Sequence, residues 1–144
     1  MSIQYKPKGY HDVTVYLVVT DAESTIKFAQ NVFDAIVVEQ MEDHGKIWHA
    51  EFQIGDTIVI IGNGRKDSTF FLTMLYVYVK DTDETYKRAI DAGAKSIMEP
   101  QDKFYGDRNA AVEDSCGNQW WIATHRENLT KKQLEARMEE IQHK

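Results

Sequence analysis

The residues best suited to chemistry in this chain are a histidine and a carboxylate two positions apart, His49 and Glu51. The surrounding segment, residues 47–54, alternates apolar and polar side chains, which predicts a β-strand. Residues two apart on a strand share a face, so the two side chains can form a general acid/base couple. The alternative is a charged surface pair on an edge strand, and both interpretations stay open at this point.

A second charged pair, Asp107 and Arg108, lies where a loop meets a predicted strand. Arg108 can hold an anionic group of a ligand, while Asp107 can orient Arg108 or a histidine. The simpler interpretation is a structural salt bridge between the two. The sequence contains no HExxH motif, phosphate-cradling glycine loop or serine-nucleophile elbow, so the common hydrolase and nucleotide-binding classes have no support from motifs.

Strand and helix signals occur twice in the same order along the chain. A β-branched and aromatic run at 13–19 predicts a strand, and Asp21 is a suitable N-cap for a helix that ends near Asp34. Strands are predicted next at 37–41, 47–54 and 57–61, and then a polar linker at 62–68. The second half has predicted strands at 71–79, 96–98, 108–113 and 119–124, and a helix that Asp81 caps and Gly93 ends.

The halves also match residue by residue at an offset of 60. The seven identities pair Tyr16, Val19, Asp21, Thr25, Lys27, Ala29 and Glu39 with Tyr76, Val79, Asp81, Thr85, Lys87, Ala89 and Glu99. The alternative is that two β-α units share an Asp cap and little else. We interpret the match as a duplication and predict an α+β fold of two paired β-α-β-β-β modules, which form a curled sheet with a ligand trough. One domain over 1–144 would contain repeat one (about 10–62), repeat two (about 69–125) and a C-terminal helix (about 130–143).

Alternation along the strands sorts their side chains into two faces. The uniformly apolar face, expected under the helices, carries Val13, Val15, Leu17, Val19, Leu75, Val77, Val79, Trp120 and Ile122. The opposite face carries Thr14, Tyr16, His49, Glu51, Met74, Tyr76, Tyr78, Gln119, Trp121, Ala123 and His125. Aromatic walls with a few polar groups are typical of a small-molecule pocket. The alternatives are a dimer interface, a solvated face, or tyrosines that only fill the trough.

Composition narrows the partners and the location. The chain has 144 residues, 42% of them hydrophobic, and a formal net charge of −6, so a nucleic-acid partner is not expected. No apolar run approaches the roughly 20 residues of a membrane helix, so no membrane association is expected. The single cysteine, Cys116, cannot form an internal disulfide, which favours a cytoplasmic location.

Several short motifs, in a fixed order along the chain, carry a resemblance to a known family. They are Lys8-Gly9-Tyr10, the run from Gly45 to Glu51, Phe104-Tyr105-Gly106-Asp107-Arg108, and the run from Glu113 to His125. In this order they resemble the glyoxalase/bleomycin-resistance/dioxygenase superfamily, also called the vicinal oxygen chelate fold, and within it the PhnB-like branch. The resemblance covers about residues 8 to 140. It implies the paired-module fold and a homodimer.

The resemblance also implies a divalent metal held by His and Glu side chains on the first and last strand of each repeat. The family spacing places these ligand positions on Thr14, Val59, Met74 and Trp121 of this sequence. None of the four is a usual ligand for such a metal. The chain is therefore predicted to have no metal at the family site and no other cofactor, with a divalent metal as the alternative.

Two functions from different classes follow from the resemblance. In the first, the trough binds a small organic molecule, flat or cationic, without transforming it. In the second, the protein is a lyase, isomerase or dioxygenase that depends on a metal or on the side chains of His49 and Glu51. The expected ligand-binding residues are Thr14, Tyr16, Met74, Tyr76, Tyr78, Phe104, Arg108 and Trp121. The C-terminal helix would pack on its own domain, on a second copy, or over the mouth of the trough.

Overall fold

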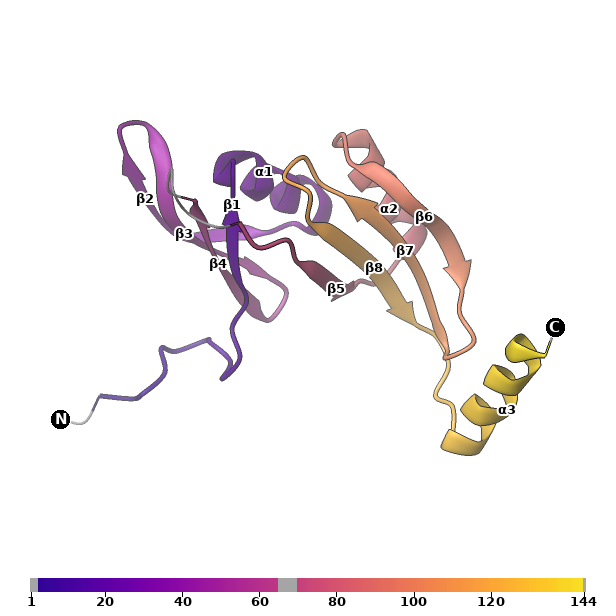
Figure 1. Ribbon diagram of the computed structural model, residues 1–144. Coiled ribbons are helices and arrows are strands. Elements are labelled where there is room, and N and C mark those ends of the chain that lie inside the picture. The colour runs from indigo at the N-terminus through magenta and orange to yellow at the C-terminus, as the bar shows by residue number, and fades with distance from the viewer. Residues whose placement is uncertain (1–2, 65–69, 144) are drawn as a thin grey trace. The chain divides into compact units, whose positions relative to one another are not determined.

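The computed structural model describes residues 3–64 and 70–143 (Figure 1). Contacts divide these residues into two compact units. The first module contains the described residues up to Thr73 together with Asp114–Asn118, and the second contains Met74–Glu113 and Gln119 onward. Each module is described by itself below.

The first module is a four-stranded mixed sheet with one helix against it. In chain order its elements are β1 (Tyr16–Val19), α1 (Ala22–Phe33), β2 (Ile36–Asp43), β3 (Lys46–Ile54) and β4 (Thr57–Asn63). The strand order is β1-β4-β3-β2, in which β1 and β4 are parallel and the other pairs antiparallel. α1 packs on β3 and β4, where Leu17, Phe52 and Ile61 are completely buried. The core of this module therefore lies between α1 and one face of the sheet.

The second module repeats this plan, and the C-terminal helix follows it. Its elements are β5 (Met74–Tyr78), α2 (Thr82–Asp91), β6 (Lys95–Asp102), β7 (Asp107–Glu113), β8 (Gln119–His125) and α3 (Lys131–Gln142). The strand order β5-β8-β7-β6 again has its parallel pair at one edge. α2 covers β6, β7 and β8, and Trp120 and Ile122 are completely buried in this core. The predicted α+β class, module order and C-terminal helix are thus confirmed.

Short polar side chains begin the helices where the sequence predicts. The Asp21 carboxylate accepts from the backbone N–H of Ser24, and the Asp81 carboxylate accepts from that of Glu84. Thr130 and Gln133 form a reciprocal capping box at the start of α3. These bonds satisfy N–H groups that have no partner inside a helix.

Two predicted strands begin later than the sequence pattern indicates. β1 starts at Tyr16, and Val13, expected under a helix, is 89% exposed. β5 starts at Met74, because the Thr73 N–H bonds to the Asn118 side chain and not to a neighbouring strand. The predicted linker at 62–68 begins too early, because β4 continues to Asn63. Residues 65–68 of this linker lie outside the described residues.

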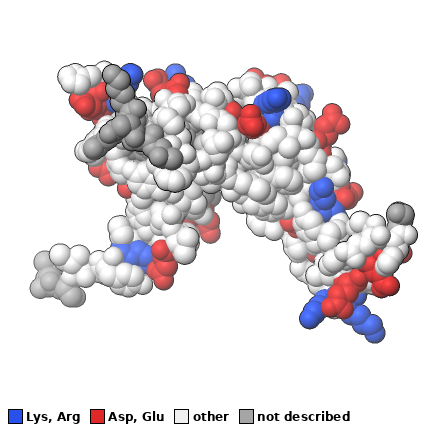
Figure 2. All heavy atoms as spheres, in the orientation of Figure 1, with Lys and Arg blue, Asp and Glu red and all other residues white. Residues whose placement is uncertain are grey.

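The C-terminal helix has an apolar stripe and no buried residue. Met138 is 41% and Ile141 53% exposed, while acidic and basic side chains gather around the same helix in Figure 2. The Arg137 guanidinium anchors the helix, because it donates to the Phe104 carbonyl and to the Glu127 carboxylate. None of the helices in the described part of the chain is long and apolar enough to cross a membrane. The homodimer stays a prediction.

Candidate functional site

Strand register fixes which side chains share the face of the second sheet opposite α2. Tyr76 pairs with Trp121, Tyr78 pairs with Ala123, and Ala123 pairs in turn with Asn109. Asp107 pairs with His125 in the next row of the same face. The face therefore brings together tyrosines from β5, a tryptophan and a histidine from β8, and polar side chains from β7.

The aromatic rings on this face form a compact group. Tyr76 stacks on Trp121, with ring centroids 6.5 Å apart and planes inclined by 17°. Tyr76 also meets Tyr78 edge to face at 5.4 Å. Tyr76 is 38% and Tyr78 61% exposed, so the rings are open to solvent. We call Tyr76, Tyr78, Tyr105 and Trp121 the aromatic face.

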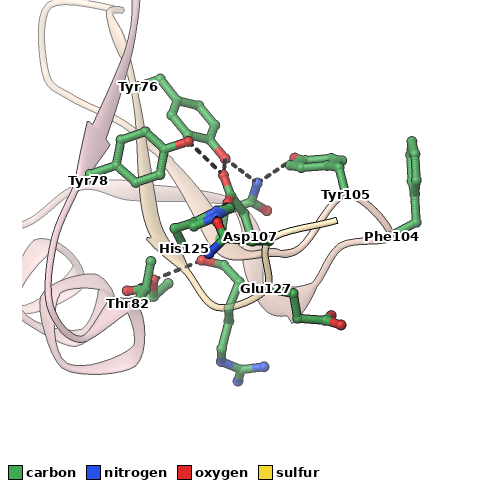
Figure 3. A network of polar contacts seen from close by, with 12 residues as sticks. Tyr76, Tyr78, Thr82, Phe104, Tyr105, Asp107, His125 and Glu127 are labelled. Carbon is green, nitrogen blue, oxygen red and sulfur yellow. Dashed lines mark hydrogen bonds and ion pairs between the residues drawn. The ribbon is translucent and has the colours of Figure 1, made fainter. Parts of the chain in front are cut away.

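A buried carboxylate holds the two tyrosine hydroxyls of β5 in place (Figure 3). One oxygen of Asp107 accepts from Tyr76 at 2.7 Å and from Tyr78 at 3.0 Å, and its other oxygen lies 2.8 Å from Nδ1 of His125. The Asp107 side chain is only 5% exposed. Burial alone would raise its pKa, but hydrogen bonds from His125, Tyr76 and Tyr78 outweigh burial and hold that pKa below the ordinary value.

The protons in this network are fixed by its acceptors. An ionised carboxylate only accepts, so Tyr76 and Tyr78 each donate their single proton to Asp107. Burial mainly raises the pKa of Tyr76, and the hydrogen bond to Asp107 mainly raises the pKa of Tyr78, so both phenols stay protonated at neutral pH. The Asn109 amide nitrogen then donates to the oxygens of Tyr76 and Tyr105, at 3.0 and 2.7 Å. Three phenols are thus held in fixed positions.

His125 is set to carry a proton. Its Nδ1 lies 2.8 Å from Asp107, and its Nε2 lies 2.8 Å from the side-chain oxygen of Asn128. The hydrogen bond to Asp107, followed by that to Asn128, raises the pKa of His125. A folded-state pKa above the unfolded one contributes stability that is complete below about pH 6.5 and is lost as pH rises through the raised pKa.

This arrangement predicts an elevated titration midpoint for His125. In an NMR titration of its ring protons, we expect the midpoint above that of an ordinary histidine, near 6.5. Asp107→Asn keeps the side-chain shape and removes the charge, so it should move the midpoint downward. Equal midpoints in the two proteins would show that Asp107 does not stabilise the imidazolium.

Arg108, predicted to bind ligand together with Tyr76, Tyr78 and Trp121, does not lie on the same face as these three residues. It pairs with Thr124, one position out of phase with Asp107, and so lies on the face that α2 covers. Its guanidinium makes two 2.9 Å bonds to Asp83 at the start of α2 and one 3.3 Å contact with Asp102. Arg108 therefore ties β7 to α2 and β6.

The open face of the first sheet contains the predicted acid/base couple. Glu51 pairs with Ile60, and Ile60 pairs in turn with Tyr16, so these three side chains share one row. His49 lies on the same face, on the central strand β3 and not on an edge strand. Its Nε2 is 3.6 Å from Oε1 of Glu51, which is too long for a hydrogen bond. The register brings the two residues together, but they are not coupled by a proton-transfer contact.

His49 and Glu51 also line different hollows of the first module. One hollow of about 220 Å³ contains Tyr16, Val18, Trp48, His49, Gly62, Asn63 and Gly64. The other, of about 370 Å³, contains Tyr5, Lys6, Pro7, Tyr10, His11, Asp12, Thr14, Glu51 and Ile60. We call the second the Glu51 hollow.

The remaining predicted ligand-binding residues are only partly gathered. Thr14 precedes β1 and donates its hydroxyl proton to the His11 carbonyl, at 2.9 Å. Met74 begins β5 and is 56% exposed. Phe104 touches Tyr105 edge to face at 5.2 Å and points away from Tyr76 (Figure 3).

Sequence reasoning missed two members of the site, Asn109 and Tyr105. Asn109 is completely buried, and its Oδ1 has no hydrogen-bond partner among the described residues. The signal that could have found Asn109 is its two-residue spacing from Asp107 on one strand. Tyr105 lies in a loop, where alternation gives no signal.

The predicted family ligand positions need one correction. Since Tyr16 pairs with Ile60 as Tyr76 pairs with Trp121, the counterpart of Trp121 is Ile60 and not Val59. Val59 is buried on the helix-covered face, 2% exposed. Ile60 offers no metal donor either, and the described residues contain no group of three or more His, Cys, Asp or Glu arranged to hold a metal. The side chains at these positions therefore do not fit the divalent metal that the family implies.

Comparison with known proteins identifies the class. The profile of the Glyoxalase/Bleomycin resistance protein/Dioxygenase superfamily matches residues 11–122. This chain belongs to that superfamily, and the superfamily resemblance of its motifs is confirmed.

Individual relatives and solved structures are also similar to this chain. The uncharacterized protein Mb0911c of Mycobacterium bovis is 29% identical over 154 residues, covering 99% of this chain and 94% of the relative. The crystal structure of TioX from Micromonospora sp. ML1 has 26% identity and a TM-score of 0.67, covering 83% of this chain and 100% of that one. The fosfomycin resistance protein FosX from Mesorhizobium loti, at 21% identity and a TM-score of 0.61, shares the fold, covering 85% of this chain and 96% of its own.

Proposed function

We propose that this protein binds a small organic molecule on its aromatic face, without transforming it and without the family metal. The observation that carries the proposal is the stacked pair of Tyr76, which is exposed, and Trp121, which is partly exposed, with ring centroids 6.5 Å apart. A contiguous exposed aromatic patch marks a site of interaction. A flat ligand would extend the stack that these two side chains begin.

The polar network supports binding because it orders the face before a ligand arrives. Asp107 and Asn109 fix the hydroxyls of Tyr76, Tyr78 and Tyr105, so little side-chain freedom remains to be lost when a ligand binds. The Tyr78 oxygen, which donates its proton to Asp107, keeps its lone pairs for a donor on the ligand. The face therefore offers both a flat apolar surface and fixed polar groups, as small-molecule sites commonly do.

The same geometry favours binding over catalysis. His49 is 3.6 Å from Glu51, and the two line separate hollows. The proton of each β5 phenol is committed to Asp107, and the Tyr76 pKa is raised, so neither tyrosine is poised as a base. The proposal also includes membership of the PhnB-like branch and a homodimer, both of which the sequence resemblance supports. It includes a cytoplasmic location as well, which the single cysteine supports.

Trp121→Ala tests the proposal directly. We expect the variant to bind acridine, a flat ring system that is uncharged at mildly alkaline pH, about tenfold more weakly, equivalent to about 1.4 kcal/mol of lost stacking. The measurement is a dialysis or fluorescence titration of the ligand.

Arg108→Ala is the matched control, because Arg108 lies on the opposite face of the same sheet. Its affinity for acridine should stay within about twofold of that of the unmodified protein. Equal affinity of the Trp121 variant and the unmodified protein would refute the aromatic face as the binding site.

A further inference from the structure

We propose that the Glu51 hollow of the first module binds a small organic cation, with its ammonium group beside the Glu51 carboxylate. The hollow has a volume of about 370 Å³ and contains no residue of the aromatic face. The site is therefore additional to the function proposed above, and either proposal can fail without the other.

The hollow is built where the N-terminal segment lies against the open face of the first sheet. Glu51 is on the central part of β3, opposite Ile60 of β4. The segment before β1 turns over these strands, and the turn is closed by a 3.2 Å bond from the Tyr10 N–H to the Pro7 carbonyl. Gly9 approaches Ile58 closely enough that an added Cβ would be 3.5 Å from its side chain. The hollow thus has a carboxylate and an aliphatic side chain from the sheet and aromatic side chains from the segment.

The Glu51 carboxylate is shielded from water, with its side chain only 16% exposed. The phenol of Tyr10 lies beside it, and burial, followed by the hydrogen bond and negative charge of Glu51, raises the pKa of Tyr10 to about 12. Tyr10 therefore remains a neutral phenol and does not add a second charge. A shielded carboxylate attracts a cation more strongly than one in bulk water does.

The cationic side chains of the hollow are already engaged by other partners. Lys6 makes a 2.5 Å ion pair with Asp12 and lies over the ring of Tyr5. His11 is 3.1 Å from the Asp56 carbonyl. Among the described residues, the ion-pair contact of Glu51 is His49 at 3.6 Å, which is charged only when protonated. A positive charge from a ligand would therefore complement Glu51.

The surroundings favour an organic cation over a metal ion. The aromatic ring of Tyr10 lines the hollow, and the faces of aromatic rings attract ammonium groups. A metal ion needs several converging donors, and no group of three acidic, histidine or cysteine side chains is arranged for one in residues 3–64 and 70–143. The occupant that fits is a substituted ammonium whose methyl groups contact the Tyr10 ring and Ile60.

The test uses choline and its uncharged isostere, 3,3-dimethylbutan-1-ol. Each is titrated into the ¹⁵N-labelled full-length protein, and amide shifts are followed by NMR. We expect choline to shift the amides of Thr14, Glu51 and Ile60 and to bind at least tenfold more tightly than the isostere. Equal affinities, or choline shifts at other residues, would overturn the proposal even if no variant were made.

Glu51→Gln then isolates the charge. We expect it to weaken choline binding at least tenfold while leaving the affinity for acridine within twofold. Glu39→Gln is the matched control, because Glu39 pairs with Glu51 across β2 and β3 and is exposed; we expect a loss below threefold. If the two variants lost choline affinity equally, choline would be attracted by the overall negative charge of this surface. That result would overturn a specific site at Glu51.

Discussion

Replacing Asp107 with alanine is expected to lower the free energy of unfolding by about 3 kcal/mol, because three side chains lose the one buried acceptor that they share. The hydroxyls of Tyr76 and Tyr78 and the imidazole of His125 all bond this carboxylate, at 2.7, 3.0 and 2.8 Å. Hydrogen bonds to a charged group contribute more than neutral ones. Partial exposure of His125, at 49%, limits the loss, because water can solvate the freed imidazole.

Urea unfolding at neutral pH measures this loss. Asp102→Ala is the matched control, since Asp102 is 71% exposed and makes a single 3.3 Å contact with Arg108. Its removal should cost less than about 0.5 kcal/mol. If the two variants had the same stability, Asp107 would not be the centre of the network.

Replacing Gly106 with alanine is expected to destabilise the protein by a similar amount, about 3 kcal/mol, through backbone strain and a steric clash. Gly106 has φ +99°, and an added Cβ would lie 2.5 Å from the Glu127 carbonyl oxygen. The Gly106 carbonyl also accepts from the N–H groups of Arg126 and Glu127. Because Glu127 binds Arg137 of α3, displacing it should also loosen the anchor of that helix.

Gly93→Ala separates the two causes. Gly93 has nearly the same backbone angle, φ +97°, but nothing lies within 4 Å of the added Cβ. It should therefore show only the cost of the left-handed conformation, about 1 kcal/mol. Chemical denaturation measures the free energy of unfolding of both glycine variants. Hydrogen exchange at residues 126 and 127 shows whether the contact of Glu127 with Arg137 of α3 has loosened. Equal losses at the two glycines would mean that the contact with Glu127 is unimportant.

The fold could be predicted largely because its signals are local. Asp21, Asp81 and Thr130 each mark a helix start through a side chain that accepts from the backbone N–H three residues later. The start of a strand depends instead on a partner distant in sequence. Thr73 shows this, since its N–H bonds to Asn118 and the β-prone residues before Met74 lie outside the strand.

The site was less predictable because it depends on register between strands. Period-two alternation places His49 and Glu51 on one face, but it does not show that they line different hollows. A shift of one residue exchanges the two faces of a strand, and of the neighbours Asp107 and Arg108 it is Asp107 that shares the face of Tyr76 and Trp121. The last hairpins of the two repeats also differ in length, which the sequence alone does not show. For this reason the counterpart of Trp121 was predicted at Val59, whereas the strand pairing places it at Ile60.

Cys116 contacts residues that are far from it in sequence, so its surroundings could not be predicted from its sequence neighbours. The sequence has no helix start near this residue, yet its sulfur lies 3.5 Å from the Asp21 carbonyl and 3.5 Å from the Thr25 hydroxyl, at the start of α1. The positions are 91 to 95 residues apart along the chain. Contacts of this kind come from the tertiary fold, which local periodicity does not encode.

The central claim, that the aromatic face is a binding site for a small organic molecule, is tested most directly by mapping acridine on the ¹⁵N-labelled protein by NMR. The account predicts that acridine shifts the amides of Tyr76, Tyr78 and Trp121 and the indole N–H of Trp121, and that Trp121→Ala abolishes this pattern. The Trp121 indole donates to the Gln119 side chain at 3.1 Å, so its signal should be well defined before ligand is added. Absence of shifts up to the solubility limit, or shifts confined to other residues, would contradict the account.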